Sequence, residues 1–155
     1  MNELAEIDSK KIEEFLNSWK DHIVNIGKVF LEEGDYKKSC LVFIKNHYAF
    51  DECEVLFKPT FTKDVVFRNN INHALSYFVS GDIYEDTGFA IKPWKTISIS
   101  ETNIIHFDEA AAVMGIFTLE PEQSSEVTDV AFTFVLIKTD KGDLKIRLHH
   151  SSVIT

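Results

Sequence analysis

The spacing of the apolar residues changes once along this chain, and that change constrains the fold more than any other feature. Before Phe89 the apolar residues recur at helical spacing, whereas from Phe89 onward they alternate with a period of two. No linker separates the two halves, and 155 residues fit one domain with a substantial core. Helices followed by a run of antiparallel strands indicate an α+β fold. We therefore predict a single α+β domain over residues 1–155.

Three helices and one short strand are predicted in the first half of the chain. The longest helix covers residues 9–33, because apolar residues recur there every three or four positions. A second helix covers residues 35–48, and a third covers 72–79 and is closed by Gly81. The short strand, at 54–59, lies between the second and third helices.

Three strands are predicted in the second half. Residues 110–119 alternate and contain Gly115, which suggests a bulge or close packing. Residues 130–137 are apolar on both faces, which indicates a strand covered on both sides. A hairpin turn at 140–143 leads into a final strand at 145–155. We expect a curved antiparallel sheet that wraps over the long helix and encloses a conical pocket.

The final strand has an unusual number of polar side chains for the end of a domain. A strict alternation would put Arg147, His149, Ser151 and Val153 on one face, and Ile146, Leu148, His150, Ser152 and Ile154 on the other. Histidine exchanges protons near neutral pH, and serine can hold a water or an oxyanion. We interpret this strand as the polar floor of the pocket.

Composition excludes several classes of partner. The formal charge of −9 leaves no basic surplus for binding nucleic acid or an anionic membrane. No segment has the apolar length that crosses a bilayer, and the acidic N-terminus lacks the apolar run of a signal peptide. We therefore expect a cytoplasmic location, with no nucleic-acid or membrane partner.

The sequence gives no support to a metal site. Cys40 and Cys53 form no Cys-x-x-Cys pair, and we expect two ordinary reduced thiols. His149 and His150 are adjacent on a strand, so their rings point to opposite faces and cannot share one ion. The other histidines lack helical ligand spacing, and we predict neither a metal nor another cofactor.

Four residues are candidates for chemistry. His149 and Ser151 share one face, about 7 Å apart along the strand, and could hold a small polar ligand or a water. The chain has no Gly-x-Ser-x-Gly elbow, which disfavours a nucleophilic triad. Thr60 and Tyr77 add hydroxyls, although a turn cap and a core aromatic are the alternative interpretations. The carboxylates at 82–86 are interpreted as a solvated loop.

Six segments, taken together and in order, resemble one known family. They are Trp19–Gly27, Gly34–Tyr36, Val55–Thr60, Ala74–Val79, Gly88–Trp94 and Leu148–Ser152. The set is similar to the iota-class carbonic anhydrases, a branch of the nuclear-transport-factor-2-like superfamily. That branch is related to the association domain of calcium/calmodulin-dependent kinase II. The motifs Phe-Lys-Pro-Thr, Ala-Leu-Ser-Tyr-Phe-Val and Gly-Phe-Ala-Ile-Lys-Pro-Trp carry the most specific part of the resemblance.

The resemblance implies a cone-like α+β barrel, a homodimer, and metal-free, reversible hydration of carbon dioxide to bicarbonate. On the matching positions, Thr60, Tyr77 and Ser151 would hold the water or bicarbonate, with His149 nearby. Two positions depart from the family pattern, because Ser80 stands where a glycine is expected and the segment 153–155 lacks the proline that the family often has. We expect this serine to alter the helix exit near Tyr77.

A metal-free mechanism must activate water by other means. Bulk water has a pKa of about 15.7, which zinc lowers to about 7 in metal enzymes. Hydroxyls and an imidazole would instead orient one water and accept its proton as it attacks carbon dioxide. Two alternatives remain open: a non-catalytic module that binds a small molecule or anion, and an oligomerisation scaffold. Substituting Tyr77 by Phe separates an enzyme from a binding module, and a ring larger than a dimer would indicate a scaffold.

Overall fold

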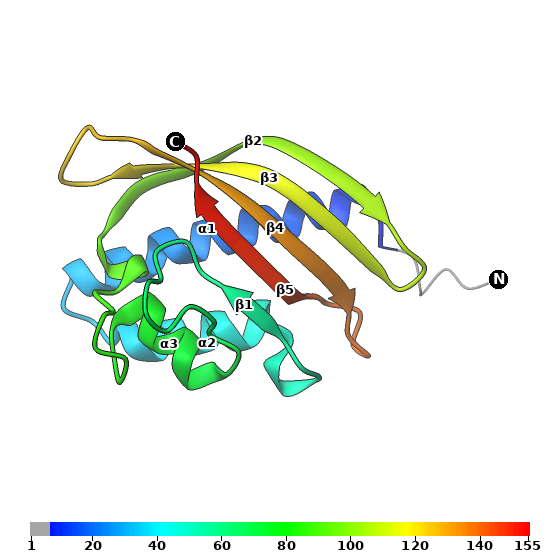
Figure 1. The fold of residues 1–155 in the computed structure, drawn as a ribbon, viewed down its shortest axis with the longest axis horizontal. Helices are drawn as coiled ribbons and strands as arrows, with labels where there is room; N and C mark the ends of the chain where they lie inside the picture. The colour runs from blue at the N-terminus through cyan, green and yellow to red at the C-terminus, as the bar shows by residue number, and fades with distance from the viewer. Residues whose placement is uncertain (1–6) are drawn as a thin grey trace.

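The computed structural model describes residues 7–155, and the acidic stretch at 1–6, where we expect no signal peptide, lies outside this range. One layer is a five-stranded sheet and the other is helical (Figure 1). The helices are α1 (Ser9–Leu31), α2 (Tyr36–His47) and α3 (Ile71–Val79), with short 3-10 turns η2 (Ala49–Asp51) and η3 (Phe89–Ile91). The strands are β1 (Leu56–Lys58), β2 (Trp94–His106), β3 (Ala110–Pro121), β4 (Thr128–Lys138) and β5 (Leu144–Val153).

The predicted α+β fold, with N-terminal helices and a curved sheet, is confirmed. Each predicted helix and strand begins and ends within two residues of its counterpart in the structure, but β2 is not predicted as a separate strand. Among residues 7–155, none of the helices has both the length and the apolar character needed to cross a membrane.

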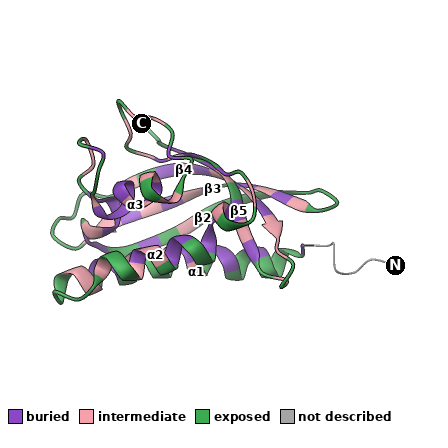
Figure 2. Cartoon of the chain, turned by 90° about the horizontal axis from the view of Figure 1, so that it is seen from below, coloured by how far each residue is buried: buried purple, intermediate pink, exposed green. Residues whose placement is uncertain are grey.

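The helices pack on one face of the sheet. The buried residues of α1 recur at helical spacing and form the stripe that meets the sheet: Ile12, Phe15, Leu16, Trp19, Ile23 and Ile26. Figure 2 shows this alternation of buried and exposed residues along α1 and α2. The apolar core therefore lies between the helical layer and the inner face of the sheet.

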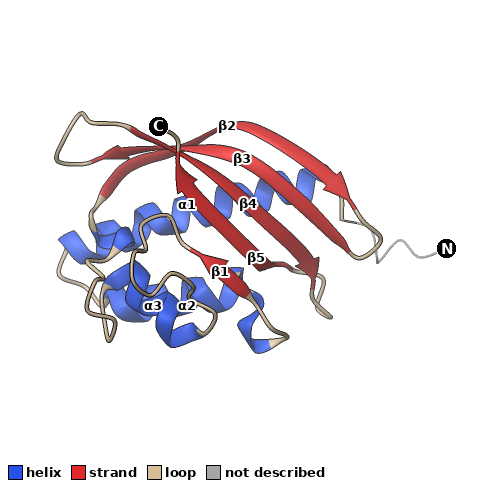
Figure 3. Ribbon diagram, in the orientation of Figure 1, coloured by secondary structure: helices blue, strands red, loops and turns tan. Residues whose placement is uncertain are grey.

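The order of the strands in the sheet is β1-β5-β4-β3-β2 (Figure 3). Strands β2 to β5 form an antiparallel meander, whereas β1 pairs with β5 in parallel. That parallel pairing sets Phe57 beside His149. Residues from the first half of the chain thus reach the strand that carries the polar cluster.

A bulge in β5 makes the predicted division of its faces wrong. Val135 pairs with Leu148 and the next residue of β4, Leu136, pairs with Ile146, so Arg147 is an extra residue. Leu144 and Ile146 are buried before the bulge, and His149 and Ser151 are buried after it. The inner face therefore combines Ile146 with His149, which strict alternation would separate.

The prediction that β4 is covered on both sides is also wrong for the single chain. Val130, Phe132, Phe134 and Leu136 are buried on the inner face, but the residues between them are only half-buried. The physical reason is that the helices lie on one side of the sheet only (Figure 1). The outer face of β4 is apolar but faces outward.

Close packing at Gly115 confirms the interpretation of that glycine. A Cβ atom at Gly115 would overlap the carbonyl oxygen of Glu101 and the ring of Phe132. The irregularity lies in the partner strand, where the pairing of β2 with β3 shifts between Ile99 and Thr102. Gly115 thus makes room for the bulge opposite to it.

Helix α3 is terminated by Ser80, and not by Gly81 as predicted. The backbone of Ser80 has φ 68° and ψ 150°, a combination that is adopted almost only by glycine. Its hydroxyl donates a hydrogen bond to the carbonyl oxygen of Asp86 at 3.2 Å. Gly81 follows and packs against Ser76, where a Cβ would lie at 3.3 Å. The helix that carries Tyr77 therefore ends in a strained residue.

Glycine should stabilise the protein relative to alanine at position 80. Alanine and glycine both lose the serine hydrogen bond, but only alanine keeps the Cβ that makes this conformation unfavourable. We expect Ser80→Gly to have a free energy of unfolding about 1 kcal/mol higher than that of Ser80→Ala, measured by urea denaturation. At a residue with negative φ, the glycine variant of a protein is less stable than the alanine variant by about 0.4–1 kcal/mol. An alanine variant as stable as the glycine variant would contradict the assigned conformation.

Candidate active site

A small cavity lies between β5, the loop that follows β1, and the end of α3. Its volume is about 10 Å³, which is enough for about one water molecule. Thr60, Tyr77, His149 and Ser151 all line it, so the structure brings together every predicted site residue. The rest of its wall is mostly aromatic or aliphatic and consists of Trp19, Phe57, Pro59, Phe78, Phe89, Phe117, Leu119 and Val130.

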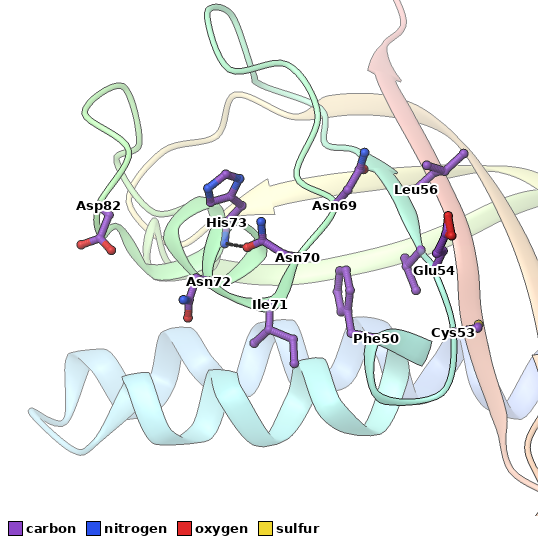
Figure 4. Close-up of a pocket in the computed structure, with 11 residues that line it drawn as sticks. Phe50, Cys53, Glu54, Leu56, Asn69, Asn70, Ile71, Asn72, His73 and Asp82 are labelled. Carbon is purple, nitrogen blue, oxygen red and sulfur yellow. Dashed lines mark hydrogen bonds between the residues drawn. The ribbon is translucent and has the colours of Figure 1, made fainter.

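A far larger groove of about 640 Å³ lies elsewhere, between η2, β1 and the start of α3 (Figure 4). It contains none of the predicted site residues. Two of its asparagine side chains are already hydrogen-bonded to the backbone. Asn69 accepts the Phe57 N–H at 2.8 Å, and Asn70 caps α3 by accepting the His73 N–H at 2.9 Å. Convergent polar groups therefore favour the smaller cavity as the candidate active site.

His149 is buried among aromatic rings and held by two hydroxyls. Its ring stacks on Phe57 at 4.6 Å and meets the edge of Phe134 at the same distance. Nδ1 lies 2.8 Å from the Tyr48 hydroxyl, and Nε2 lies 2.5 Å from Ser151 Oγ. Burial lowers the pKa of His149 well below its ordinary value, so the imidazole is neutral at physiological pH.

Tyr77 presents a protonated phenol to the cavity. It lies in the last turn of α3, stacks on Phe89 at 5.7 Å, and is 5 % exposed. Its oxygen accepts the Phe61 N–H at 3.2 Å. Burial raises the pKa of Tyr77, and the Phe61 N–H and the Thr60 hydroxyl oppose that shift only in part. Tyr77 therefore keeps its proton at neutral pH and can donate it in a hydrogen bond.

Thr60 is the least buried of the four predicted site residues and marks the mouth of the cavity, and Lys58 lies two residues before it, at the end of β1. Thr60 is half-buried, whereas Tyr77, His149 and Ser151 are buried. Lys58 Nζ donates to the Ser151 carbonyl oxygen at 3.1 Å, and burial lowers the pKa of this lysine. A cation thus lies beside the strand that carries Ser151, in a protein of net charge −9.

A buried ion pair fixes the two loops around Tyr77. The Arg68 side chain is fully buried and binds Asp86 through both of its terminal nitrogens, at 2.7 and 2.8 Å. Ser76 donates to the same carboxylate at 2.5 Å, and the Arg68 guanidinium lies 5.8 Å from the centre of the Tyr77 ring. Glu85 accepts backbone N–H groups of the loop that follows Thr60. The prediction of a solvated loop is therefore wrong for Glu85 and Asp86, although Asp82 is exposed.

Four residues of this region are not predicted from the sequence as site residues: Trp19, Tyr48, Phe57 and Arg68. Trp19 and Tyr48 fit the apolar stripes of α1 and α2, so their polar atoms carry no separate signal. Phe57 reaches His149 only through the parallel pairing of β1 with β5. Arg68 lies outside the regular elements, where a charged residue is normally taken to be exposed.

Within residues 7–155, no three histidine, cysteine, aspartate or glutamate side chains cluster in a way that could hold a metal ion. Cys40 and Cys53 are free thiols.

The fold is the one found in nuclear-transport-factor-2-like proteins. A nuclear-transport-factor-2-like protein of unknown function from Shewanella oneidensis superposes with a TM-score of 0.59 over 94% of this chain and 99% of that chain. The two sequences are 16% identical, so this likeness concerns the fold alone.

Closer similarities identify the family. A crystal structure of the iota-carbonic anhydrase from a cyanobacterium, complexed with bicarbonate, superposes with a TM-score of 0.92 and 29% identity, covering 97% of this chain and 94% of that chain. A metal-independent carbonic anhydrase from Nostoc sp. strain PCC 7120 is 32% identical over 141 residues, 88% of this chain and 68% of the relative. The sequence model of the metal-independent carbonic anhydrase family matches residues 10–153. This chain belongs to that family.

Breaking the buried ion pair should destabilise the protein strongly. Arg68→Met leaves the Asp86 carboxylate buried without its partner, which costs about 3–5 kcal/mol of the free energy of unfolding. The double variant Arg68→Met/Asp86→Leu should recover part of that loss, because it leaves no unpaired charge. Chemical denaturation measures both. Lys20→Met, at the exposed pair with Asp21, is the control and should change stability by less than about 1 kcal/mol. A similarly small effect of Arg68→Met would contradict a structural role for the pair.

Proposed function

We propose that this protein catalyses the reversible hydration of carbon dioxide to bicarbonate without a metal ion, as a carbonic anhydrase (carbonate dehydratase, a lyase). The observation that carries this proposal is the meeting of three hydroxyls, from Thr60, Tyr77 and Ser151, with the His149 imidazole around one aromatic-lined cavity. Family membership supports the same activity. The similar cyanobacterial structure contains bicarbonate, and we assign bicarbonate to the cavity of this chain.

The aromatic wall suits the apolar substrate. Carbon dioxide is small and has no net dipole, so a wall that includes Phe57, Phe89 and Phe117 favours it over bulk water. Holding it beside a fixed water converts an encounter in solution into a reaction within the cavity. Such positioning can lower the activation free energy by several kcal/mol, because good orientation removes about 7–11 kcal/mol of the barrier in intramolecular reactions.

The hydroxyls act on the charge that develops during the attack. As the water oxygen bonds to the carbon of carbon dioxide, negative charge moves onto a carbon dioxide oxygen. The protonated Tyr77 phenol donates to that oxygen, and Ser151 lies on the same cavity wall. Lys58 contributes positive charge from beside Ser151. In the reverse direction the same groups hold bicarbonate.

One proton must leave the attacking water. Sequence considerations favour an imidazole as acceptor, but both nitrogens of His149 are engaged and its pKa is lowered by burial. Thr60 is the half-buried hydroxyl at the mouth, so we assign to it a relay: its oxygen accepts the proton of the attacking water while its own hydroxyl proton passes to a solvent water or buffer. The overall step is balanced: water and carbon dioxide give bicarbonate, and one proton passes to solvent or buffer.

Replacing the Tyr77 hydroxyl should separate catalysis from mere binding. Tyr77→Phe removes one donor to the developing charge, and we expect the kcat/KM of carbon dioxide hydration to fall about 100-fold in stopped-flow assays. Tyr36→Phe is the matched control, because Tyr36 packs on Phe30 outside the cavity, and it should keep the wild-type rate. Wild-type activity should survive dialysis against a chelator. Unchanged activity in Tyr77→Phe would favour a non-catalytic role for this residue, and loss of activity on chelation would refute a metal-free reaction.

We further propose that the chain forms a homodimer in the cytoplasm, and the outer face of the sheet supports the dimer. This face carries Ala112, Met114, Ile116, Ala131, Thr133 and Val135, which pair across β3 and β4. The helices leave it uncovered, and Met114 at its centre is 59% exposed. A second copy of the chain would bury an apolar surface that is otherwise in contact with water.

Placing a charge on this outer face should separate the two copies. We expect light scattering coupled to size exclusion to give twice the chain mass for the wild type and the chain mass for Met114→Glu. Val42→Glu, an equally drastic change at an exposed apolar residue of α2, should leave the dimer intact. A monomeric wild type, or a larger ring, would contradict the proposed dimer.

A further inference from the structure

A chain of hydrogen bonds runs from α1 to the cavity through buried groups. The Trp19 Nε1–H donates to Tyr48 Oη at 3.2 Å. Tyr48 Oη lies 2.8 Å from His149 Nδ1, and His149 Nε2 lies 2.5 Å from Ser151 Oγ. Tyr48 is fully buried at the C-terminal end of α2, and Trp19 is 3 % exposed. The chain thus links three distant segments to a hydroxyl that faces the cavity.

The protons of this chain can be arranged in two ways. In the first, Tyr48 donates to Nδ1, and the Nε2–H of His149 donates to Ser151. In the second, the Nδ1–H donates to Tyr48, and Ser151 donates to Nε2. Both arrangements keep the imidazole neutral, as its burial requires.

The acceptor available to the Tyr48 proton distinguishes the two arrangements. Indole is a donor only, so it always occupies one acceptor position of the Tyr48 oxygen. In the second arrangement that oxygen would accept twice, and its own proton would have no acceptor. The hydrogen bonds of the described residues give Tyr48 Oη no third partner, and a buried donor without an acceptor costs free energy. The first arrangement leaves only the Ser151 proton without a protein acceptor, and Ser151 lines the cavity, where a water or bicarbonate oxygen can accept that proton. The first arrangement is therefore favoured.

The first arrangement decides what Ser151 offers to the cavity. Because the His149 Nε2–H donates to Ser151 Oγ, the serine proton is not used within the chain and is free to point into the cavity. In the second arrangement that proton would be directed at the imidazole, and the cavity would meet only serine lone pairs. Tyr77 is a donor for a parallel reason, since its oxygen already accepts the Phe61 N–H. Two hydroxyl donors then face the same space, which suits an anionic oxygen.

We propose that Tyr48 is a positioning residue: it fixes His149 in the Nε2–H tautomer and thereby makes Ser151 a hydrogen-bond donor to the bound bicarbonate oxygen. This inference rests on the proposed carbonic anhydrase function. Tyr48 does not line the cavity and acts only through His149. Its role resembles that of a group that orients a catalytic imidazole by engaging its other nitrogen.

The tautomer can be measured directly on the full chain. Long-range proton–nitrogen correlation NMR distinguishes a protonated from an unprotonated ring nitrogen, and loss of the signal in His149→Gln assigns it. We expect the wild type to carry the proton on Nε2. A wild-type His149 that carries it on Nδ1 overturns the inference, whether or not the Tyr48 variant folds. Trp19→Phe tests the same chain, and we expect it to keep the Nε2–H form, because Tyr48 can still donate to Nδ1.

Kinetics test the consequence for Ser151. Tyr48→Phe removes the hydroxyl that engages His149 Nδ1, so the imidazole is no longer held in one tautomer and orientation. We expect the kcat/KM of carbon dioxide hydration to fall about threefold or more. In a Ser151→Ala background, the same substitution should change kcat/KM by less than about twofold, because the donor that Tyr48 controls is already absent. Equal losses in both backgrounds would show that Tyr48 acts through packing, and would overturn the inference.

The outcomes also separate this inference from the proposed function. If the wild type hydrates no carbon dioxide but carries the His149 proton on Nε2, the function is wrong. Bicarbonate titration followed by the Ser151 and His149 signals then tests the donor role, and weaker binding in Tyr48→Phe would support it, whereas unchanged binding would overturn it. If the wild type is active and carries the proton on Nδ1, the function stands and the inference is wrong.

Discussion

One extra residue in the last strand determines which side chains reach the cavity. Without the bulge at Arg147, continuing the alternation from Leu144 and Ile146 would turn His149 and Ser151 outward. With it, both polar side chains join the inner face, and the parallel pairing with β1 sets the Phe57 ring against the imidazole. The local break in the ladder is small, but the aromatic enclosure of His149 depends on it.

The mouth of the cavity is held by charge rather than by regular structure. The segments on either side of α3, residues 59–70 and 80–93, have few backbone hydrogen bonds to the sheet. Arg68 in the first segment pairs with Asp86 in the second. Glu85 in the second segment accepts backbone N–H groups of the first. Tyr77 and Thr60 are positioned by these segments. Site geometry therefore depends on a buried ion pair, which is sensitive to loss of either partner.

The sequence predicts the fold well and the site in part. Helical spacing and period-two alternation depend on local residues, so the helices, the hairpin at 140–143 and most strand boundaries are visible in them. The bulge at Arg147 has no such signal, because it depends on the register of β4 with β5. Thr60, Tyr77, His149 and Ser151 are visible as polar groups in apolar surroundings and through family resemblance. Tyr48 and Arg68 are not, since their partners are distant in sequence and their roles depend on tertiary contacts.

The small size of the cavity has a consequence for selectivity. A space that accommodates about one water has no volume for an extended acyl group or an aromatic ester. Discrimination among reactants thus begins with steric exclusion, before any polar group is engaged. Water and carbon dioxide together exceed the space of one water, so the aromatic side chains of the wall must move apart before both reactants fit.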